Sequence, residues 1–161
     1  MAVVVVSGGF DPLHKGHLCY LREARELITL DGCRGELIAI VNKNDFLIKK
    51  KGYFCLDEKT RLDIMSSIKY VDEAMLAVDN DMTVNETLKV IREKYRDSNI
   101  VFCNGGDRTE GNIPEAETCK KLDIFMYNGL GDKIESSSNI INNVIKQLKT
   151  KEEKRNEIQG Y

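Results

Sequence analysis

The sequence lacks several features that would place it in common classes of protein. No apolar run approaches the roughly 20 residues that a membrane-spanning helix needs. The short apolar run at 2–6 has no basic flank, which favours a buried strand over a signal peptide. The net charge at pH 7 is only −2, which gives no reason to expect a nucleic acid or an anionic membrane as partner.

Cysteine and proline are present but form none of the patterns that carry a function. The five cysteines are widely spaced, odd in number and without a CxxC pair, which predicts reduced thiols in a cytoplasmic protein and no zinc site. The two prolines form no linker, and the chain shows no internal repeat. We therefore expect one domain over residues 1–150, followed by a short charged tail at 151–161.

Apolar residues alternate along the chain between strand-like and helix-like spacing. Asp57 is a candidate helix N-cap, and Thr83 with Glu86 forms a capping-box pattern. Strands that alternate with helices predict an α/β fold, in which a parallel sheet of five strands carries helices on both faces. Such sheets bind ligands at the carboxyl ends of their strands. The expected strands are 2–6, 36–41, 73–78, 99–103 and 123–128, and the expected helices are 18–28, 57–68, 83–95, 114–122 and 138–148.

Both histidines of the chain lie directly after the first expected strand, in the segment SGGFDPLHKGH. His14 and His17 are three residues apart where the loop turns into a helix, so both side chains can face one pocket. Gly8 and Gly9 permit a tight turn. Gly16 permits close approach of a phosphate to the helix N-terminus, where free N–H groups and the helix dipole favour an anion. Two imidazoles beside such a site are suited to donating hydrogen bonds to phosphoryl oxygens.

The stretch GGFDPLHKGH resembles the (G/N)xFDxxHxGH signature of the cytidylyltransferase-like nucleotidyltransferases. That superfamily includes glycerol-phosphate cytidylyltransferases, heptose-phosphate adenylyltransferases and nicotinamide-mononucleotide adenylyltransferases. The resemblance implies a Rossmann-like fold, and attack by the phosphate of a small acceptor on the α-phosphorus of a nucleoside triphosphate. It also implies that the two histidines contact the triphosphate, that Mg²⁺ accompanies it, and that Phe10 and Asp11 belong to the nucleotide site. The histidine spacing is not that of a zinc helix, so no metal ligands are predicted in the protein itself.

The three lysines at 49–51, and Arg61 on the next expected helix, resemble the mobile lysine loop and the arginine of the same superfamily. The resemblance implies that these cations hold the β- and γ-phosphates and offset the charge of the departing pyrophosphate. The sequence does not decide which lysine acts. We take Lys51 and Arg61 as the candidates, with a merely solvated lysine loop as the alternative.

Two further loops follow expected strands and would converge on the same edge of the sheet. Asn104-Gly105-Gly106-Asp107 resembles the GGD loop of heptose-phosphate adenylyltransferases, which lies against the nucleotide; a simple tight turn is the alternative. Ser136, Ser137 and Ser138 open the last expected helix. One of them is predicted to be the N-cap, and the others suit the β- and γ-phosphates, as a Ser-Thr-Thr segment does in the family.

The choice of nucleotide depends on conflicting resemblances. Arg108-Thr109-Glu110-Gly111 matches part of a cytidylyltransferase signature, but it lies in a different loop from the serines, and no arginine stands directly before them. The GGD loop and the serines favour ATP, whereas Lys51-Gly52-Tyr53 and Tyr70-Val71-Asp72-Glu73 resemble the CTP-dependent glycerol-phosphate enzymes. We predict transfer of AMP, or alternatively CMP, to a sugar or polyol phosphate with release of pyrophosphate. A non-catalytic nucleotide sensor on the same fold is the rival prediction, and a homodimer through the last helix is compatible with both.

Overall fold

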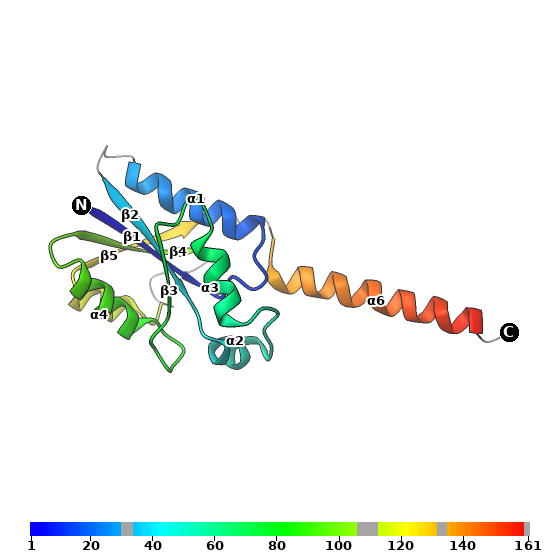
Figure 1. The fold of residues 1–161 in the computed structure, drawn as a ribbon. Helices are drawn as coiled ribbons and strands as arrows, with labels where there is room; N and C mark the ends of the chain where they lie inside the picture. Colours follow the sequence, from blue (N-terminus) through cyan, green and yellow to red (C-terminus); the bar gives the residue numbers. More distant parts are fainter. Residues whose placement is uncertain (30–33, 106–112, 132–134, 160–161) are drawn as a thin grey trace.

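A single parallel sheet forms the centre of the computed structural model, which describes residues 1–29, 34–105, 113–131 and 135–159 (Figure 1). The strand order is β3-β2-β1-β4-β5, and every neighbouring pair is parallel. β1 lies in the middle because its valine run is buried on both faces, as expected of a central parallel strand. The strands are β1 (Ala2–Gly8), β2 (Gly35–Val41), β3 (Glu73–Leu76), β4 (Asn99–Gly105) and β5 (Ile124–Leu130).

Helices cover both faces of this sheet, as predicted. Successive side chains of a strand point to opposite faces, so Val3 and Val5 pack with α4 and α5, while Val4 and Val6 pack with α1 and α3. Figure 1 shows α4 on the side of the sheet opposite α1 and α3. The helices are α1 (Lys15–Thr29), α2 (Asn44–Lys51), α3 (Glu58–Ser66), α4 (Asn85–Lys94), α5 (Ala116–Lys121) and α6 (Ser137–Gln159).

Two local predictions about the helices need correction, and one is confirmed. The Asp57 carboxylate accepts hydrogen bonds from the backbone N–H groups of Lys59 and Thr60, which confirms it as the N-cap of α3. The capping box predicted for α4 is wrong: Asp79, from the preceding loop, accepts the N–H groups of Glu86 and Thr87 instead. α2 was not predicted at all, because it is charge-rich and buries only one side chain, so its sequence has no apolar period.

α6 is longer than predicted and continues through the charged segment to Gln159. It projects away from the sheet and its covering helices (Figure 1). Val144, Ile145 and Leu148 are exposed on it, and the homodimer expected through this helix remains a prediction. No helix in the described part of the chain is both long and apolar enough to cross a membrane. Cys19, Cys55, Cys103 and Cys119 are free thiols, and Cys33 lies outside the described residues.

Candidate functional site

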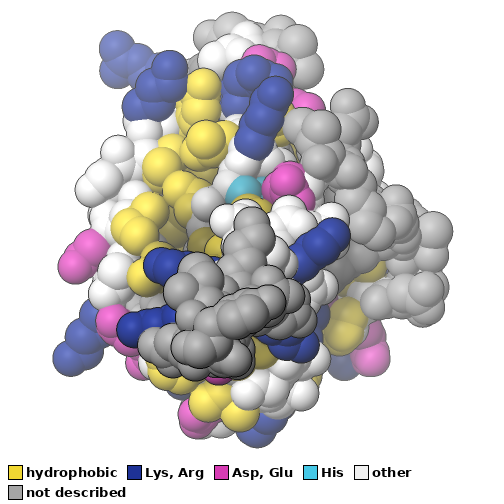
Figure 2. Space-filling model, turned by 90° about the vertical axis from the view of Figure 1, so that its right-hand side faces the viewer, with side chains coloured by type: hydrophobic (Ala, Val, Ile, Leu, Met, Phe, Trp, Pro, Cys, Tyr) yellow, Lys and Arg dark blue, Asp and Glu magenta, His cyan; other side chains and the backbone are white. Residues whose placement is uncertain are grey.

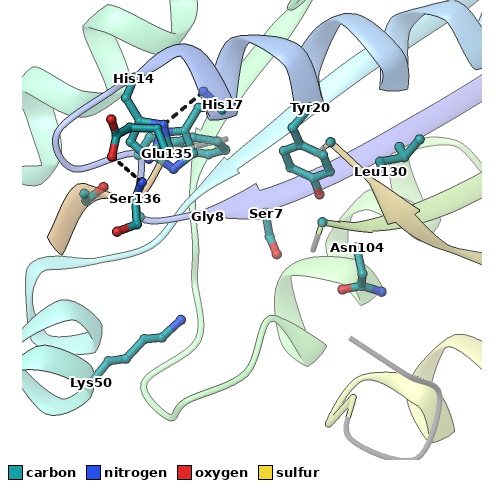
Figure 3. A pocket seen from close by; sticks show the side chains of 16 residues that line it. Ser7, Gly8, His14, His17, Tyr20, Lys50, Asn104, Leu130, Glu135 and Ser136 are labelled. Atoms are coloured by element: carbon teal, nitrogen blue, oxygen red, sulfur yellow. Dashed lines mark hydrogen bonds between the residues drawn. The ribbon is translucent and has the colours of Figure 1, made fainter. Parts of the chain in front are cut away.

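A cavity of about 430 Å³ opens at the carboxyl ends of β1, β4 and β5 (Figure 3). This is where the strand order reverses direction, with β2 on one side of β1 and β4 on the other, and open α/β sheets bind ligands at such a point. The sequence-predicted residues that line it are Gly8, Gly9, Phe10, His14, Gly16, His17, Gly105, Ser136 and Ser137. The topology therefore brings together the motif loop, the loop after β4 and the start of α6.

The two histidines of the motif stack against each other at the wall of the cavity. Their ring centroids are 3.8 Å apart with an interplanar angle of 25°, and the ring centroids of Phe10 and His17 are 5.2 Å apart in an edge-to-face arrangement. The backbone N–H of Gly16 donates to Nδ1 of His14 at 3.1 Å. Because Nδ1 accepts this bond, a neutral His14 must carry its proton on Nε2, where the ring acts as a donor. Figure 3 shows both imidazoles beside Glu135 and Ser136.

Both imidazoles are held in the neutral form. The pKa of His17 is lowered to about 3, first by burial and then by the unfavourable electrostatic interaction of a protonated His17 with His14 and Lys51. Burial also lowers the pKa of His14, against a smaller opposing attraction from Glu135. Within the described residues, Nδ1 of His17 is buried without a hydrogen-bond partner. At neutral pH the pair therefore offers N–H donors and carries no positive charge.

Gly16 is required by the position of His14. A Cβ atom on Gly16 would lie 2.9 Å from Cε1 and 3.0 Å from Nδ1 of the His14 ring, and 3.4 Å from the carbonyl oxygen of Glu135. A side chain at this position would therefore push the imidazole out of its bond with the Gly16 N–H. The sequence motif assigned this glycine to phosphate approach, and the structure adds this second reason.

Two of the three serines at the start of α6 have identifiable structural roles. The hydroxyl of Ser136 accepts the N–H of Asn139 at 3.1 Å, which confirms that one serine caps the helix. The hydroxyl of Ser137 donates to the carbonyl of Pro12 at 3.2 Å, so it ties α6 to the motif loop. Ser138 is exposed and does not line the cavity.

The predicted cations are not arranged as the resemblance implied. Lys51 ends α2, and its ammonium donates to the carbonyl of Asp11 at 2.8 Å and to the Asp11 carboxylate at 3.4 Å. Its neighbour Lys50 lines the cavity instead, and Figure 3 shows it reaching in from α2. Arg61 is fully buried and does not line the cavity; its guanidinium donates to backbone carbonyls and to Asn44.

Asp11 holds the motif loop in place through hydrogen bonds of its buried carboxylate. Its carboxylate is 2% exposed and accepts the N–H groups of Cys55 at 2.7 Å and Leu56 at 2.8 Å, so it holds the loop against the segment before α3. The described residues include no group of three or more side chains that could hold a metal ion. Gly106 and Asp107, together with the tetrad at 108–111, lie outside the described residues.

Several cavity residues carried no recognisable signal in the sequence. Tyr20 resembled any apolar residue of a helix, yet its hydroxyl donates to the carbonyl of Cys103 at 2.6 Å, its ring lies against Gly105, and its Cβ and backbone lie against Gly131. In the sequence, Asn104 stood out only as the residue that precedes the two glycines of the GGD loop. The remaining unpredicted lining residues are Ser7, Leu130, Gly131 and Glu135, whereas Lys50 is one of the three lysines between which the sequence did not decide.

Comparison with known proteins places these features in a family. Residues 5–156 match the model of the family described as cytidylyltransferase-like. The chain is 32% identical over 129 residues to a FAD synthase of Thermoplasma acidophilum, covering 80% of this chain and 78% of the relative. It is 40% identical over 80 residues to a FAD synthase of Methanobrevibacter ruminantium, covering 49% of this chain and 51% of that protein. The matched region thus spans only about half the length of some of the curated relatives.

A solved structure supports the same assignment. The lipopolysaccharide core biosynthesis protein of Thermoplasma volcanium is 27% identical, with a TM-score of 0.61 over 83% of this chain and 99% of that protein. The family match, the parallel sheet and the histidine pair at the carboxyl end of β1 agree with one another. The chain belongs to the cytidylyltransferase-like family of nucleotidyltransferases.

Proposed function

We propose that this protein transfers AMP from ATP to the phosphate of FMN, producing FAD and pyrophosphate. The relatives named FAD synthase support this acceptor, because FAD consists of FMN joined through its phosphate to AMP. The sequence favoured a sugar or polyol phosphate, and the names of these relatives favour a flavin phosphate in its place. The same names support ATP over CTP, because the group added to FMN is AMP.

The observation that carries the proposal is the neutral, stacked histidine pair at the cavity wall. In the reaction, an oxygen of the FMN phosphate attacks the α-phosphorus of ATP. A new P–O bond forms, the bond between the α-phosphorus and the bridging oxygen to the β-phosphate breaks, and that oxygen leaves with pyrophosphate. Charge develops on the oxygens of the transferred group, where Nε2 of His14 can donate a hydrogen bond. The chain needs no nucleophile of its own, because the acceptor supplies it.

Stabilisation of the leaving pyrophosphate falls to groups that border the same cavity. Lys50 replaces Lys51 as the candidate cation, because Lys50 lines the cavity and the ammonium of Lys51 is bonded to Asp11. Ser136 and Ser137 open α6 beside it, and the N-terminus of a long helix favours an anion. Arg61 supports this arrangement indirectly, because its guanidinium donates a hydrogen bond to the carbonyl of Gly9 and so fixes the backbone of the motif loop.

We infer that magnesium enters with the nucleotide. The described residues form no metal-ligand cluster, and Mg²⁺ commonly binds through substrate phosphates and water with few protein ligands. Bound in this way, it would supply positive charge along the triphosphate. Among the described residues that line this cavity, Glu135 is the one carboxylate, and one of its oxygens already accepts the N–H of Ser136 at 2.9 Å.

The test is product formation with defined substrates. The protein is incubated with Mg²⁺, ATP and FMN, and FAD is quantified by chromatography together with released pyrophosphate. CTP replaces ATP in one arm, and riboflavin or glycerol 3-phosphate replaces FMN in others. FAD should form only with ATP and FMN, and His14→Ala should lower turnover about 10²–10³-fold. Pyrophosphate release with glycerol 3-phosphate but not FMN would refute the acceptor. Nucleotide binding without pyrophosphate release in any arm would indicate a sensor.

A further inference from the structure

A second cavity of about 260 Å³ adjoins the first and shares part of its wall. Ser7, Gly8, Gly9 and Lys50 line both cavities. The first cavity extends from this shared wall toward the histidines and α6, whereas the second extends toward the loops after β2, before α4 and before α5. If the triphosphate lies against the histidines, the second cavity is therefore the space that can bring an acceptor to the α-phosphorus.

Two residues that line the second cavity, Glu115 and Asn42, each have a buried side-chain oxygen without a partner among the described residues. Glu115 is 5% exposed; its Oε1 accepts the N–H of Val84 at 3.1 Å, and its Oε2 accepts nothing. Asn42 is 6% exposed, and its Oδ1 likewise accepts nothing. Leaving such acceptors unsatisfied is costly, above all for a carboxylate. Two of them lining one cavity indicate a ligand that brings hydrogen-bond donors.

Four apolar side chains contribute to a cavity wall that is otherwise largely polar. Phe46 comes from α2, and Met82, Val84 and Pro114 come from the loops before α4 and α5. A sugar or polyol phosphate would place hydroxyl groups against these apolar side chains, which offer no hydrogen-bond partners. A flat ring that carries an N–H group on its edge matches both the apolar side chains and the carboxylate.

We propose that this cavity holds the isoalloxazine ring of the acceptor, and that Oε2 of Glu115 accepts the ring's single N–H. The proposal rests on the proposed function. Asn42 lines the second cavity and is bonded through its backbone N–H to the carbonyl of Gly8, so it adjoins the shared wall. The phosphate therefore lies near Gly8 and Lys50, the ribityl chain passes Asn42, and the ring reaches Glu115. Glu115 is then a specificity-determining residue with no part in the phosphoryl chemistry.

The experiment compares FMN with FMN methylated on the ring imide nitrogen, in binding as well as turnover. Binding is followed by quenching of flavin fluorescence, which needs no reaction. The wild-type protein should bind FMN at least tenfold more tightly than the methylated analogue. Glu115→Gln keeps an oxygen for the Val84 N–H but loses the free carboxylate oxygen. It should weaken FMN binding about 10- to 100-fold and abolish the discrimination.

Two variants control this comparison. Glu117→Gln, two residues further along on exposed α5, loses only an ion pair with Lys121 and should bind FMN as the wild type does. Met82→Asp places a charge at the apolar rim, where the side chain is 39% exposed and folding is not at risk, and should also weaken FMN binding. The ATP-induced thermal shift should be the same in all variants, because the first cavity is untouched.

The failures of the two proposals can be told apart. If the wild-type protein makes FAD, but Glu115→Gln binds FMN and the methylated analogue as the wild type does, the ring site is wrong and the proposed function stands. If Glu115→Gln weakens FMN and its analogue equally, the carboxylate contacts a hydroxyl of the acceptor, which also overturns the ring assignment. If FMN neither binds nor reacts while ATP binds, both proposals fall.

Discussion

Replacing Arg61 with lysine should destabilise the protein far more than it alters the chemistry. Arg61 is 0% exposed, and its guanidinium donates four hydrogen bonds of 2.7–2.9 Å that join three separate segments. A lysine keeps the charge but has a compact ammonium with three donors in place of a planar fork. One or more of the four acceptors of Arg61 would then lose its hydrogen bond. These acceptors are the carbonyl oxygens of Leu56, Gly9 and Asn42 and Oδ1 of Asn44.

The magnitude follows from the number of bonds at risk. Losing one or two charge-assisted bonds and leaving buried carbonyls unsatisfied costs about 3 kcal/mol. For a chain of this length that corresponds to a fall in Tm of about 6–12 °C. The assay is thermal unfolding by circular dichroism, run in parallel with turnover. The matched control is Arg22→Lys, because Arg22 is exposed on α1 and makes only long contacts of 3.9 Å with Glu26 and with Sγ of Cys19. Its Tm should change by less than about 2 °C.

The rival interpretation comes from the family resemblance, in which this arginine contacts the pyrophosphate. It predicts a normal Tm for Arg61→Lys together with a large loss of turnover. That result would refute the structural role assigned here and would mean that the arginine reorients when nucleotide binds. If both Tm and turnover fall, turnover is measured at a temperature well below the Tm, where all of the protein is folded. The turnover at that temperature then reports the effect on the chemistry alone.

Three further predictions concern the cavity itself. Lys50→Met should keep the Tm within about 2 °C while lowering turnover about 10- to 100-fold, because Lys50 lines the cavity. Lys49→Met should retain activity, because the ammonium of Lys49 lies by the carbonyl of Asn80. Equal losses in both variants would argue against a role for Lys50. Gly16→Ala should lower turnover at least tenfold by displacing His14, with no loss of stability because alanine favours helix over glycine, and a fully active variant would contradict the packing argument. His17 has a folded-state pKa of about 3, below its usual value near 6.5, so the unfolded chain takes up this proton first as the pH falls; the free energy of unfolding should drop between pH 6.5 and 3 by up to about 1.4 kcal/mol per pH unit. His17→Asn should flatten that slope in denaturant titrations at pH 7, 5.5 and 4.5, and an unchanged slope would mean that His17 is not buried in the neutral form.

The fold could be predicted because each of its strands has a distinct local pattern. The valine run of β1 has the composition of a strand buried on both faces, and the alternation with helical periods leaves a parallel sheet as the natural arrangement. The position of the histidine pair also followed from the sequence, since a glycine-rich turn after the first strand places them at the carboxyl edge. These inferences depend only on chain neighbours, which a sequence shows directly.

The contacts of charged side chains could not be predicted in this way. Lys49, Lys50 and Lys51 are equivalent in sequence, and only the orientation of α2 sends Lys50 to the cavity and Lys51 to Asp11. Arg61 looks like a surface residue of an amphipathic helix, and its burial depends on carbonyls that come together only in the folded chain. Glu115 gave no signal for the same reason, because the loops that surround it are distant in sequence.

The shared wall of the two cavities explains why the motif loop contains residues without large side chains at 7–9. These residues end the central strand of the sheet and separate the histidine side from the Glu115 side. A Cβ atom on Gly9 would lie 2.6 Å from Cδ2 of Leu47, so a side chain there would displace the one side chain that α2 buries, and α2 carries Lys50. In the proposed reaction, the same bulk would stand where the acceptor phosphate meets the α-phosphorus. The small residues therefore hold α2 close and leave the path between the two substrates open, and a mechanism of direct transfer requires both.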